Sequence, residues 1–344
     1  MSSDYVALHK RAARLFAEIG CHSEIQLSSL RAGGNNRVYR LKTSTGVYVL
    51  KEYFRHHGDN RDRLEAEFSF ASFAWANGIR CIPEPIARDD EEGLGLYSFL
   101  DGERIESETV SNADIKQAID FVASLNRFRE TPKARKLPNG SEACFTLQQH
   151  LDLLEKRLDR LKNITAGSHI DYHALAFVSA KLKPAYSQLS IRIRESLVAL
   201  NFEAAAELPL EERIISPSDF GFHNALRRPD GRIAFFDFEY AGWDDPAKMT
   251  GDFFSQVAVP VSLLHEDFML NAVADMFPNR DSALIRMQLL LPLYRIKWCC
   301  ILLNHFLPVD STRRAFAQGI AEDHKTKQLA KAESLLSSID QFNI

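Results

Sequence analysis

The sequence predicts an α+β protein of two lobes, in which a small antiparallel sheet with one helix precedes a larger, mainly helical lobe. Short runs rich in β-branched and aromatic residues dominate residues 1–100, and helical periodicity dominates from residue 111 onward. The change falls near the LDG at residues 100–102. We therefore expect an N-terminal lobe of residues 1–100 and a C-terminal lobe of residues 101–344.

The first lobe is predicted to consist of a helix followed by strands and one further helix. MSSDYVALHKRAARLF places charged and apolar residues at helical spacing and lacks the apolar core of a secretory signal, so we expect a surface helix. Strands are expected at 25–31, 37–43 and 46–53, with two more between 83 and 100. A helix is expected at 61–78, where an Asn-Gly pair ends it.

Helices are expected throughout the second lobe, at 111–130, 144–163, 171–199, 262–276, 281–304 and 311–339. Only residues 213–238 interrupt this run with strand-like composition. The most apolar stretch, residues 289–306, contains Pro292 and Arg295, which favours a core helix over a membrane span. A ligand is expected in the cleft between the two lobes.

The composition argues against several classes of function. Apolar residues make up 45% and charged residues 26%, as in an ordinary globular protein, and the net charge of −4 argues against a nucleic-acid partner. The five cysteines are scattered and form no CxxC pair, which indicates free thiols in a reducing compartment, so we expect a cytoplasmic protein with no membrane partner. A serine hydrolase is not favoured, because no GxSxG motif is present.

A carboxylate and an amide lie five residues apart in the segment SPSDFGFHNAL, as Asp219 and Asn224. The following NALRRPDGRIAFFDFEY reads as two short strands joined by a PDG reversal. Folding this hairpin about Asp230 pairs positions whose numbers sum to roughly 460, which brings Asn224 across from Phe236 and Asp237. These oxygen-bearing side chains describe a Mg²⁺ site completed by a nucleotide, and Glu239 is a plausible ligand of a second metal ion.

The catalytic loop of kinases has the same spacing: an Asp, four residues, an Asn, and then a strand and reversal ending in a metal-binding Asp. On this interpretation Asp219 accepts or orients the proton of the attacking hydroxyl group. Asn224 and Asp237 hold the magnesium ion that neutralises charge on the transferring phosphoryl group. Such a reaction demands mainly positioning and electrostatic stabilisation from the protein.

A kinase also needs a glycine-rich turn over the phosphates and a strand lysine paired with a helix glutamate. The segment RAGGNNRVYRL supplies the turn, with Gly33, Gly34, Asn35 and Asn36. Lys51 ends the apolar strand VYVLKEY, and Glu67 on the next helix is the preferred partner, with Glu65 as the alternative. The order in which these features occur is stronger support for a kinase than any one of them alone.

From the GGNN turn to about residue 254, the chain resembles the aminoglycoside phosphotransferase and choline kinase family of small-molecule kinases. PSDFGFHN, DFE and AGWDDPAKMTGDFF occupy the places of that family's HGDxxxxN, its DxD or DxE element and its GDP-containing tail. No long activation segment and no APE element follows Asp237, which argues against a protein kinase. Pro217 and Ser218 depart from the family's His-Gly, so loop geometry and turnover stay open. His223 is interpreted as a packing residue, with a substitute base as the alternative.

The resemblance implies a protein-kinase-like fold, Mg²⁺ and ATP as cofactors, with GTP as an alternative donor, and a small-molecule hydroxyl acceptor such as an amino alcohol, a sugar or an aminoglycoside. It also implies a hinge whose backbone bonds to adenine. The segment LYSFLDG matches that hinge, which makes Ser98, Phe99 and Leu100 the candidates for the adenine side.

The residues that would contact the acceptor are less defined. Trp243, Asp244 and Asp245 either face the acceptor or form a packed indole and a helix N-cap. Four acidic residues near the cleft would suit a cationic acceptor, namely Asp101, Glu103, Asp244 and Asp245, although acidic surface residues are common. The sequence specifies neither the acceptor nor the oligomeric state.

Two other classes of function compete with the kinase. A pseudokinase that binds nucleotide without turnover is motivated by Pro217 and Ser218. A metal-dependent hydrolase could use Asp219, Asp237 and Glu239, but it would leave the GGNN turn and the strand lysine unexplained.

Overall fold

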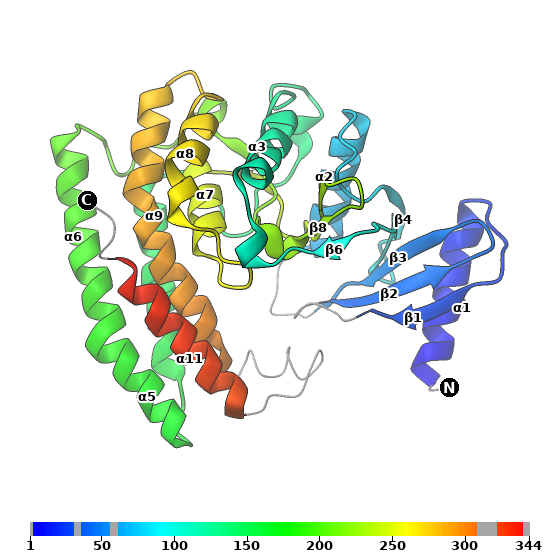
Figure 1. Ribbon diagram of the computed structural model, residues 1–344, viewed down its shortest axis with the longest axis horizontal. Coiled ribbons are helices and arrows are strands. Elements are labelled where there is room, and N and C mark those ends of the chain that lie inside the picture. The colour runs from blue at the N-terminus through cyan, green and yellow to red at the C-terminus, as the bar shows by residue number, and fades with distance from the viewer. Residues whose placement is uncertain (1–2, 31–35, 56–60, 308–321, 340–344) are drawn as a thin grey trace.

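The first part of the chain forms a five-stranded antiparallel sheet of order β1-β2-β3-β5-β4 (Figure 1). The structure is a computed structural model that describes residues 3–30, 36–55, 61–307 and 322–339. The strands are β1 Gln26–Ser29, β2 Arg37–Lys42, β3 Val47–Glu52, β4 Pro85–Asp89 and β5 Leu94–Ser98. Helix α1 (Ser3–Glu18) precedes the sheet and α2 (Arg63–Ala76) connects β3 to β4, which confirms the predicted order of elements.

Side chains of β3 alternate between the two faces of the sheet, and each face is covered by one helix. Leu50 lies in an apolar cluster with Leu15 and Phe16 of α1. The next residue, Lys51, contacts Glu67 of α2. Because side chains alternate along a strand with a period of two, a lysine that directly follows a leucine facing α1 must emerge on the α2 side.

The remainder of the chain is mainly helical, as predicted. Its helices are α3 Asn112–Asn126, α4 Leu147–Arg160, α5 His169–Phe177, α6 Lys183–Ala199, α7 Pro246–Ser255, α8 Glu266–Ala274, α9 Arg280–Leu303 and α11 Glu322–Ser337. The predicted helix at 171–199 is α5 and α6 joined by the π-helical turn Val178–Leu182. Part of the predicted helix at 311–339 lies outside the described residues.

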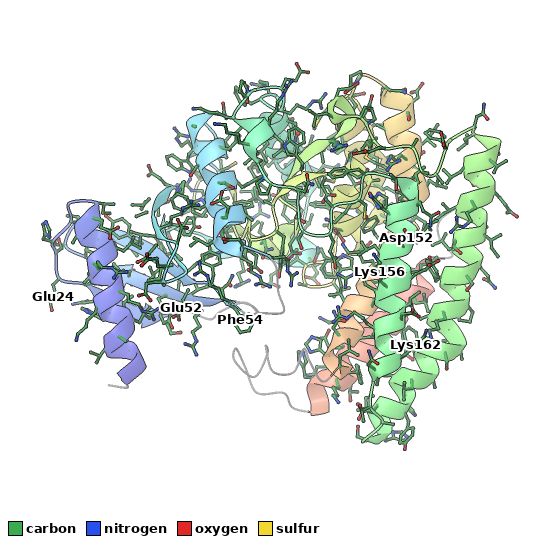
Figure 2. All side chains as sticks on the ribbon, turned by 180° about the vertical axis from the view of Figure 1, so that it is seen from behind. Glu24, Glu52, Phe54, Asp152, Lys156 and Lys162 are labelled. Atoms are coloured by element: carbon green, nitrogen blue, oxygen red, sulfur yellow. The ribbon has the colours of Figure 1, made fainter. Side chains whose placement is uncertain are left out.

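Short strands connect these helices and link them to the sheet end of the molecule. They are β6 Glu103–Arg104, β7 Ile214–Ser216, β8 Ala225–Arg227, β9 Ile233–Phe235 and β10 Gly242–Asp244. Strand β6 pairs with β8, and β10 pairs with β7. Viewed from behind, Glu52 lies at the sheet end, whereas Asp152, Lys156 and Lys162 lie on the helical part (Figure 2).

The cysteines and the most apolar helix have the states that the sequence predicts, free thiols and a core helix. All five cysteines are free thiols. The apolar stretch after residue 289 forms the second half of α9, which is largely buried in the main core. Within the described ranges, no helix has both the length and the apolar character that crossing a bilayer requires.

Helix α7 was not among the predicted helices, since its segment was interpreted only as the tail that follows DFE. All ten of its residues are buried. It packs closely against α9, and a Cβ atom built on Gly251 would lie 2.5 Å from ring carbons of Tyr294. Glycine at this position therefore permits the close approach of the two helices.

We predict that Gly251→Ala destabilises the protein by about 1–3 kcal/mol, because the added methyl group overpacks the contact with Tyr294. Urea unfolding would measure the loss. Ser187→Ala, at an exposed position of α6, is the control and should stay within about 0.5 kcal/mol of the wild type. Equal stability of the two variants would contradict this account of the packing.

Candidate active site

A buried ammonium group lies between two carboxylates where the sheet meets the helical part. Lys51 Nζ donates to Glu67 Oε1 at 2.7 Å, to Glu67 Oε2 at 3.0 Å and to Asp237 Oδ1 at 2.8 Å. Glu65 is instead paired with Arg88, so the structure selects Glu67 over the alternative partner. Three segments distant in the sequence, β3, α2 and the end of the β8–β9 hairpin, thus meet at Lys51.

The surroundings of this group keep Lys51 protonated. Burial alone would lower the pKa of Lys51, but the charges of Asp237 and Glu67 outweigh it and hold that pKa above its ordinary value. Burial raises the pKa of Glu67, and Lys51 opposes this effect. The hydroxyl group of Tyr53 donates to Glu67 Oε2 at 2.6 Å, which fixes the carboxylate that holds the lysine.

Asp219 and Asn224 lie together in the loop between β7 and β8. Asn224 Nδ2 donates to the backbone oxygen of Asp219 at 3.0 Å and to Asp219 Oδ2 at 3.2 Å. His223 Nε2 lies 3.2 Å from Asp219 Oδ1, so this histidine contacts the predicted base directly and does more than pack. Burial raises the pKa of Asp219, but His223 and Asn224 outweigh it and hold that pKa below its ordinary value. The carboxyl group is therefore ionised at neutral pH.

The hairpin that follows has the register predicted from the sequence. Ala225 pairs with Phe235, and the Phe236 amide donates to the Asn224 carbonyl at 3.0 Å. Asp237 then adopts the left-handed conformation with φ of 70°. An aspartate tolerates this region better than most residues, and the turn aims its carboxylate back at Lys51.

Two cavities meet at these residues. The smaller, of about 640 Å³, is lined by Lys51, Glu67, Asn224 and Asp237, together with the apolar side chains of Val38, Val49, Leu226 and Phe236. The larger, of about 910 Å³, is lined by Asp219, Ser218 and residues from α2, α4, α7 and α9. Glu239 lines both cavities. The two cavities therefore adjoin at Glu239.

The structure places the remaining predicted site residues as follows. Gly33, Gly34 and Asn35 lie outside the described residues. Asn36 is buried, and its side-chain amide donates to Glu239 Oε2 at 2.6 Å. Glu239 also lies 3.5 Å from Arg63 Nε, so its carboxylate is held by protein groups. Its assignment as a ligand of a second metal ion stays a prediction.

The three hinge candidates line the smaller cavity. The Ser98 amide already donates to the Glu84 carbonyl at 2.9 Å, and Ser98 Oγ accepts from the Glu84 amide at 2.8 Å. Ser98 is thus committed to the strand pair β4–β5. We therefore expect the adenine-facing backbone groups to come from Phe99 and Leu100.

Comparison with known protein families identifies the chain. Residues 26–248 match the model of the phosphotransferase enzyme family, which includes the aminoglycoside phosphotransferases. The chain belongs to this family. It is therefore a phosphotransferase, and its relatives of this fold are small-molecule kinases. No curated protein matches the sequence.

Solved structures of low sequence identity share the fold of this phosphotransferase. An ethanolamine kinase of Plasmodium vivax matches with a TM-score of 0.59 at 13% identity, over 97% of this chain and 89% of its own. A choline kinase of Streptococcus pneumoniae matches with a TM-score of 0.57 at 15% identity, over 96% and 99%. A spectinomycin phosphotransferase, solved with ADP and spectinomycin, matches with a TM-score of 0.60 at 12% identity, over 96% and 98%.

The departure from the family's His-Gly does not collapse the loop. Ser218 adopts the left-handed region, with φ of 66°, where a glycine would be unstrained. Two hydrogen bonds hold it there: its amide donates to Ser216 Oγ at 2.9 Å, and its Oγ accepts from Lys248 Nζ at 3.2 Å. Ser218 thus occupies the backbone conformation that suits a glycine.

Three charged residues that line the larger cavity, Lys248, Asp252 and Lys297, were not predicted as site residues. Lys297 Nζ donates to both oxygens of Asp252, at 2.9 and 2.8 Å, and Lys248 Nζ donates to Asp244 Oδ2 at 2.6 Å. All four side chains are buried. The sequence gives only a weak sign of these ion pairs, namely charged residues within the segment AGWDDPAKMTGDFF and within the apolar stretch after residue 289. Such charges are equally typical of a solvated helix face.

Of the two roles considered for residues 243–245, contact with the acceptor or structural support, the structure shows the structural one. Trp243 is buried and its indole donates to the Ala134 carbonyl at 2.9 Å. Asp245 caps α7, and His150 and Arg286 bind its other oxygen. Burial raises the pKa of Asp244 to about 6, although Lys248 opposes it. Asp244 and Asp245 are thus buried and occupied by ion pairs, which argues against a role for them in attracting a cationic acceptor.

We predict that Ser218→Gly is more stable than Ser218→Ala by about 1 kcal/mol, since both lose the hydroxyl contact with Lys248 but only alanine keeps the left-handed strain. Denaturant unfolding of the two variants side by side would measure this difference. An alanine variant as stable as the glycine variant would show that the backbone here is not strained.

Proposed function

We propose that this phosphotransferase moves the γ-phosphoryl group of ATP to a hydroxyl group of a polar small molecule, with Mg²⁺ as cofactor. The arrangement of the two cavities carries the proposal. Asp219 lines the larger cavity, whereas Lys51 and Asp237 line the smaller. A donor in the smaller cavity and an acceptor in the larger would meet beside the ionised Asp219 carboxylate.

The smaller cavity suits a nucleotide. Its apolar walls, which include Val38, Val49 and Leu226, can enclose a purine, and Phe99 and Leu100 can offer backbone groups to the base edge. The ammonium group of Lys51 is placed to bind phosphate oxygens. The ADP of the spectinomycin phosphotransferase and the AMP of the Streptococcus pneumoniae choline kinase, both bound to proteins of this fold, support this assignment. GTP remains an alternative donor.

The charge at the junction of the cavities favours a divalent cation. One ammonium group, Lys51, faces two carboxylates, Glu67 and Asp237, which leaves a net negative charge. Asp237 and Asn224 line the same cavity and are the hard oxygen ligands that Mg²⁺ prefers. Within the described residues, no three carboxylate, imidazole or thiol groups form a metal cluster, so phosphate oxygens and water would complete the coordination. When bound, magnesium neutralises charge on the phosphates.

The protein's own groups would orient the acceptor and take its proton. Asp219 is held by His223 on one oxygen and Asn224 on the other, which restricts the rotation of the carboxylate. As an ionised group beside the larger cavity, it can accept a hydrogen bond from the attacking hydroxyl group and receive its proton. Hydrogen bonds hold Ser218 in the left-handed backbone conformation that suits a glycine, so the loop keeps its shape. This favours an active enzyme over an inactive scaffold.

The walls of the larger cavity favour a polar acceptor of the amino alcohol, sugar or aminoglycoside type. Ion-paired groups, among them Glu142, Asp252 and Lys297, line it together with the indole of Trp298. The Tyr240 ring lies beneath the guanidinium groups of Arg61 and Arg63, at 5.6 and 5.9 Å from the ring centroid. This face of the tyrosine is therefore less suited to receive a quaternary ammonium group.

We predict that Asp219→Asn lowers kcat by about 10²–10⁴-fold while ATP affinity changes little, because asparagine keeps the shape but cannot take a proton. Nucleoside diphosphate release would be followed with a panel of hydroxylated acceptors. Asp120→Asn, at an exposed ion pair on α3, is the matched control. Tight binding of Mg-ATP with no acceptor-stimulated turnover in the wild type would instead indicate a scaffold. Hydrolytic activity that survives Lys51→Ala would indicate a hydrolase.

We also predict that Mg²⁺ tightens ATP binding to the wild type and that Asp237→Asn removes most of this effect, a loss of at least about tenfold in the magnesium-dependent affinity. Lys51 keeps its contact with Glu67 in this variant, so magnesium-free binding should change less. Calorimetric titrations of ATP with and without Mg²⁺ would separate the magnesium-dependent part of the ATP affinity from the magnesium-free part. An equal magnesium effect in both proteins would remove Asp237 from the proposed metal site.

A further inference from the structure

A third cavity, of about 370 Å³, lies outside both cavities of the candidate active site. It is formed by the connection from α2 to β4, the end of α3 and the β8–β9 hairpin. None of its lining residues lines either of the other two cavities. The proposed reaction therefore does not use it.

Positive charge is concentrated in this cavity. Four of its lining residues are arginines, Arg80, Arg127, Arg228 and Arg232, and its lining includes no aspartate or glutamate. The protein as a whole carries a net charge of −4. Arg228 is half-buried, whereas Arg80, Arg127 and Arg232 are exposed, so water screens part of their mutual repulsion and a bound anion would offset the rest. We call this set of residues the arginine pocket.

Only part of this charge is neutralised by the protein. Arg232 pairs with Asp230 of the hairpin turn at 2.6 Å. Over residues 3–30, 36–55, 61–307 and 322–339, Arg127 and Arg228 form no ion pair with a carboxylate. Asp230 thus neutralises one arginine of the pocket, and at least two others have no carboxylate partner among these residues.

The geometry of the pocket suits a compact anion. The guanidinium group of Arg80 lies 4.1 Å from the centroid of the Trp75 ring, and its Nη1 donates to the Trp75 and Ile79 carbonyls at 2.7 and 3.3 Å. Part of the donor capacity of Arg80 is therefore used within the protein, and Arg127 and Arg228 carry most of the capacity left for an anion. Ile79 and Ile233 are buried and form an apolar floor. Planar guanidinium groups bind phosphate oxygens in pairs, and the floor can receive the organic part of an ester.

We propose that the arginine pocket binds a small anion that carries a phosphate group. Free phosphate, pyrophosphate and phosphate monoesters share this chemistry. An acidic peptide would also be attracted by the charge, but the volume of about 370 Å³ and the two buried isoleucines fit a small molecule better.

The test is calorimetric titration of the full-length protein with inorganic phosphate, pyrophosphate and phenyl phosphate. We expect binding to the wild type that becomes at least about tenfold weaker in the double variant Arg127→Gln/Arg228→Gln. A control double variant, Arg135→Gln/Arg192→Gln, removes the same charge at exposed positions elsewhere and should bind as the wild type does. Thermal unfolding of each variant would confirm that it is folded.

A further arm separates this pocket from the proposed nucleotide site. Lys51 lines the nucleotide cavity and not the arginine pocket, so binding in the arginine pocket should survive Lys51→Met in a variant that thermal unfolding shows to be folded, even if the proposed function fails. Binding that Lys51→Met abolishes and the arginine double variant leaves intact would overturn the proposal. So would binding of polyglutamate in the absence of binding by any of the three phosphate compounds. Tighter binding of phenyl phosphate than of phosphate would identify an ester as the ligand class.

Discussion

The contact of Lys51 with two carboxylates is the interaction on which the arrangement of the site depends. An ammonium group buried at 7% exposure would lose its charge or destabilise the fold unless carboxylates surrounded it. Glu67 comes from α2 and Asp237 from the segment after β9, so satisfying one charge draws together parts of the chain that are far apart in the sequence. The phenol of Tyr53 then holds Glu67, and the position of β3 relative to α2 follows.

Buried ion pairs also hold together the helices that line the larger cavity. Lys248 and Lys297 share the carboxylate of Asp252, at 3.7 and 2.8 Å, and this pairing ties α7 to α9. Asp245 anchors the start of α7 through His150 and Arg286. Burial of such groups is tolerated only where partners are in place, which makes α7 a rigid support for the loop that carries Asp219 and Ser218.

Much of the fold and part of the site could be read from the sequence. The sheet, the helices and the register of the β8–β9 hairpin follow from local patterns, namely the period of two, the period of 3.6 and the PDG reversal. The pairing of Lys51 with Glu67 followed from the order of motifs known in kinases. These signals are local, or they are carried by a resemblance, and that is why they were visible.

The remainder depends on tertiary contacts that no local pattern encodes. Helix α7 is buried on all sides, so its polar residues reveal neither a face nor their partners until α9 is in place. The contact of Asn36 with Glu239 spans 203 positions of sequence. The arginine pocket combines residues from three separate segments, each of which alone looks like an ordinary charged surface.

The conformation of Ser218 has a consequence for how relatives of this chain are recognised. The loop preserves its shape because a serine takes a backbone geometry that glycine normally supplies, with a neighbouring lysine to anchor it. A search keyed to the letters His-Gly-Asp would pass over such chains. A search for the torsion angles of the residues before the aspartate, and for a lysine in the following helix, would retrieve such chains. It would group proteins by the conformation of the loop and not by its amino-acid sequence.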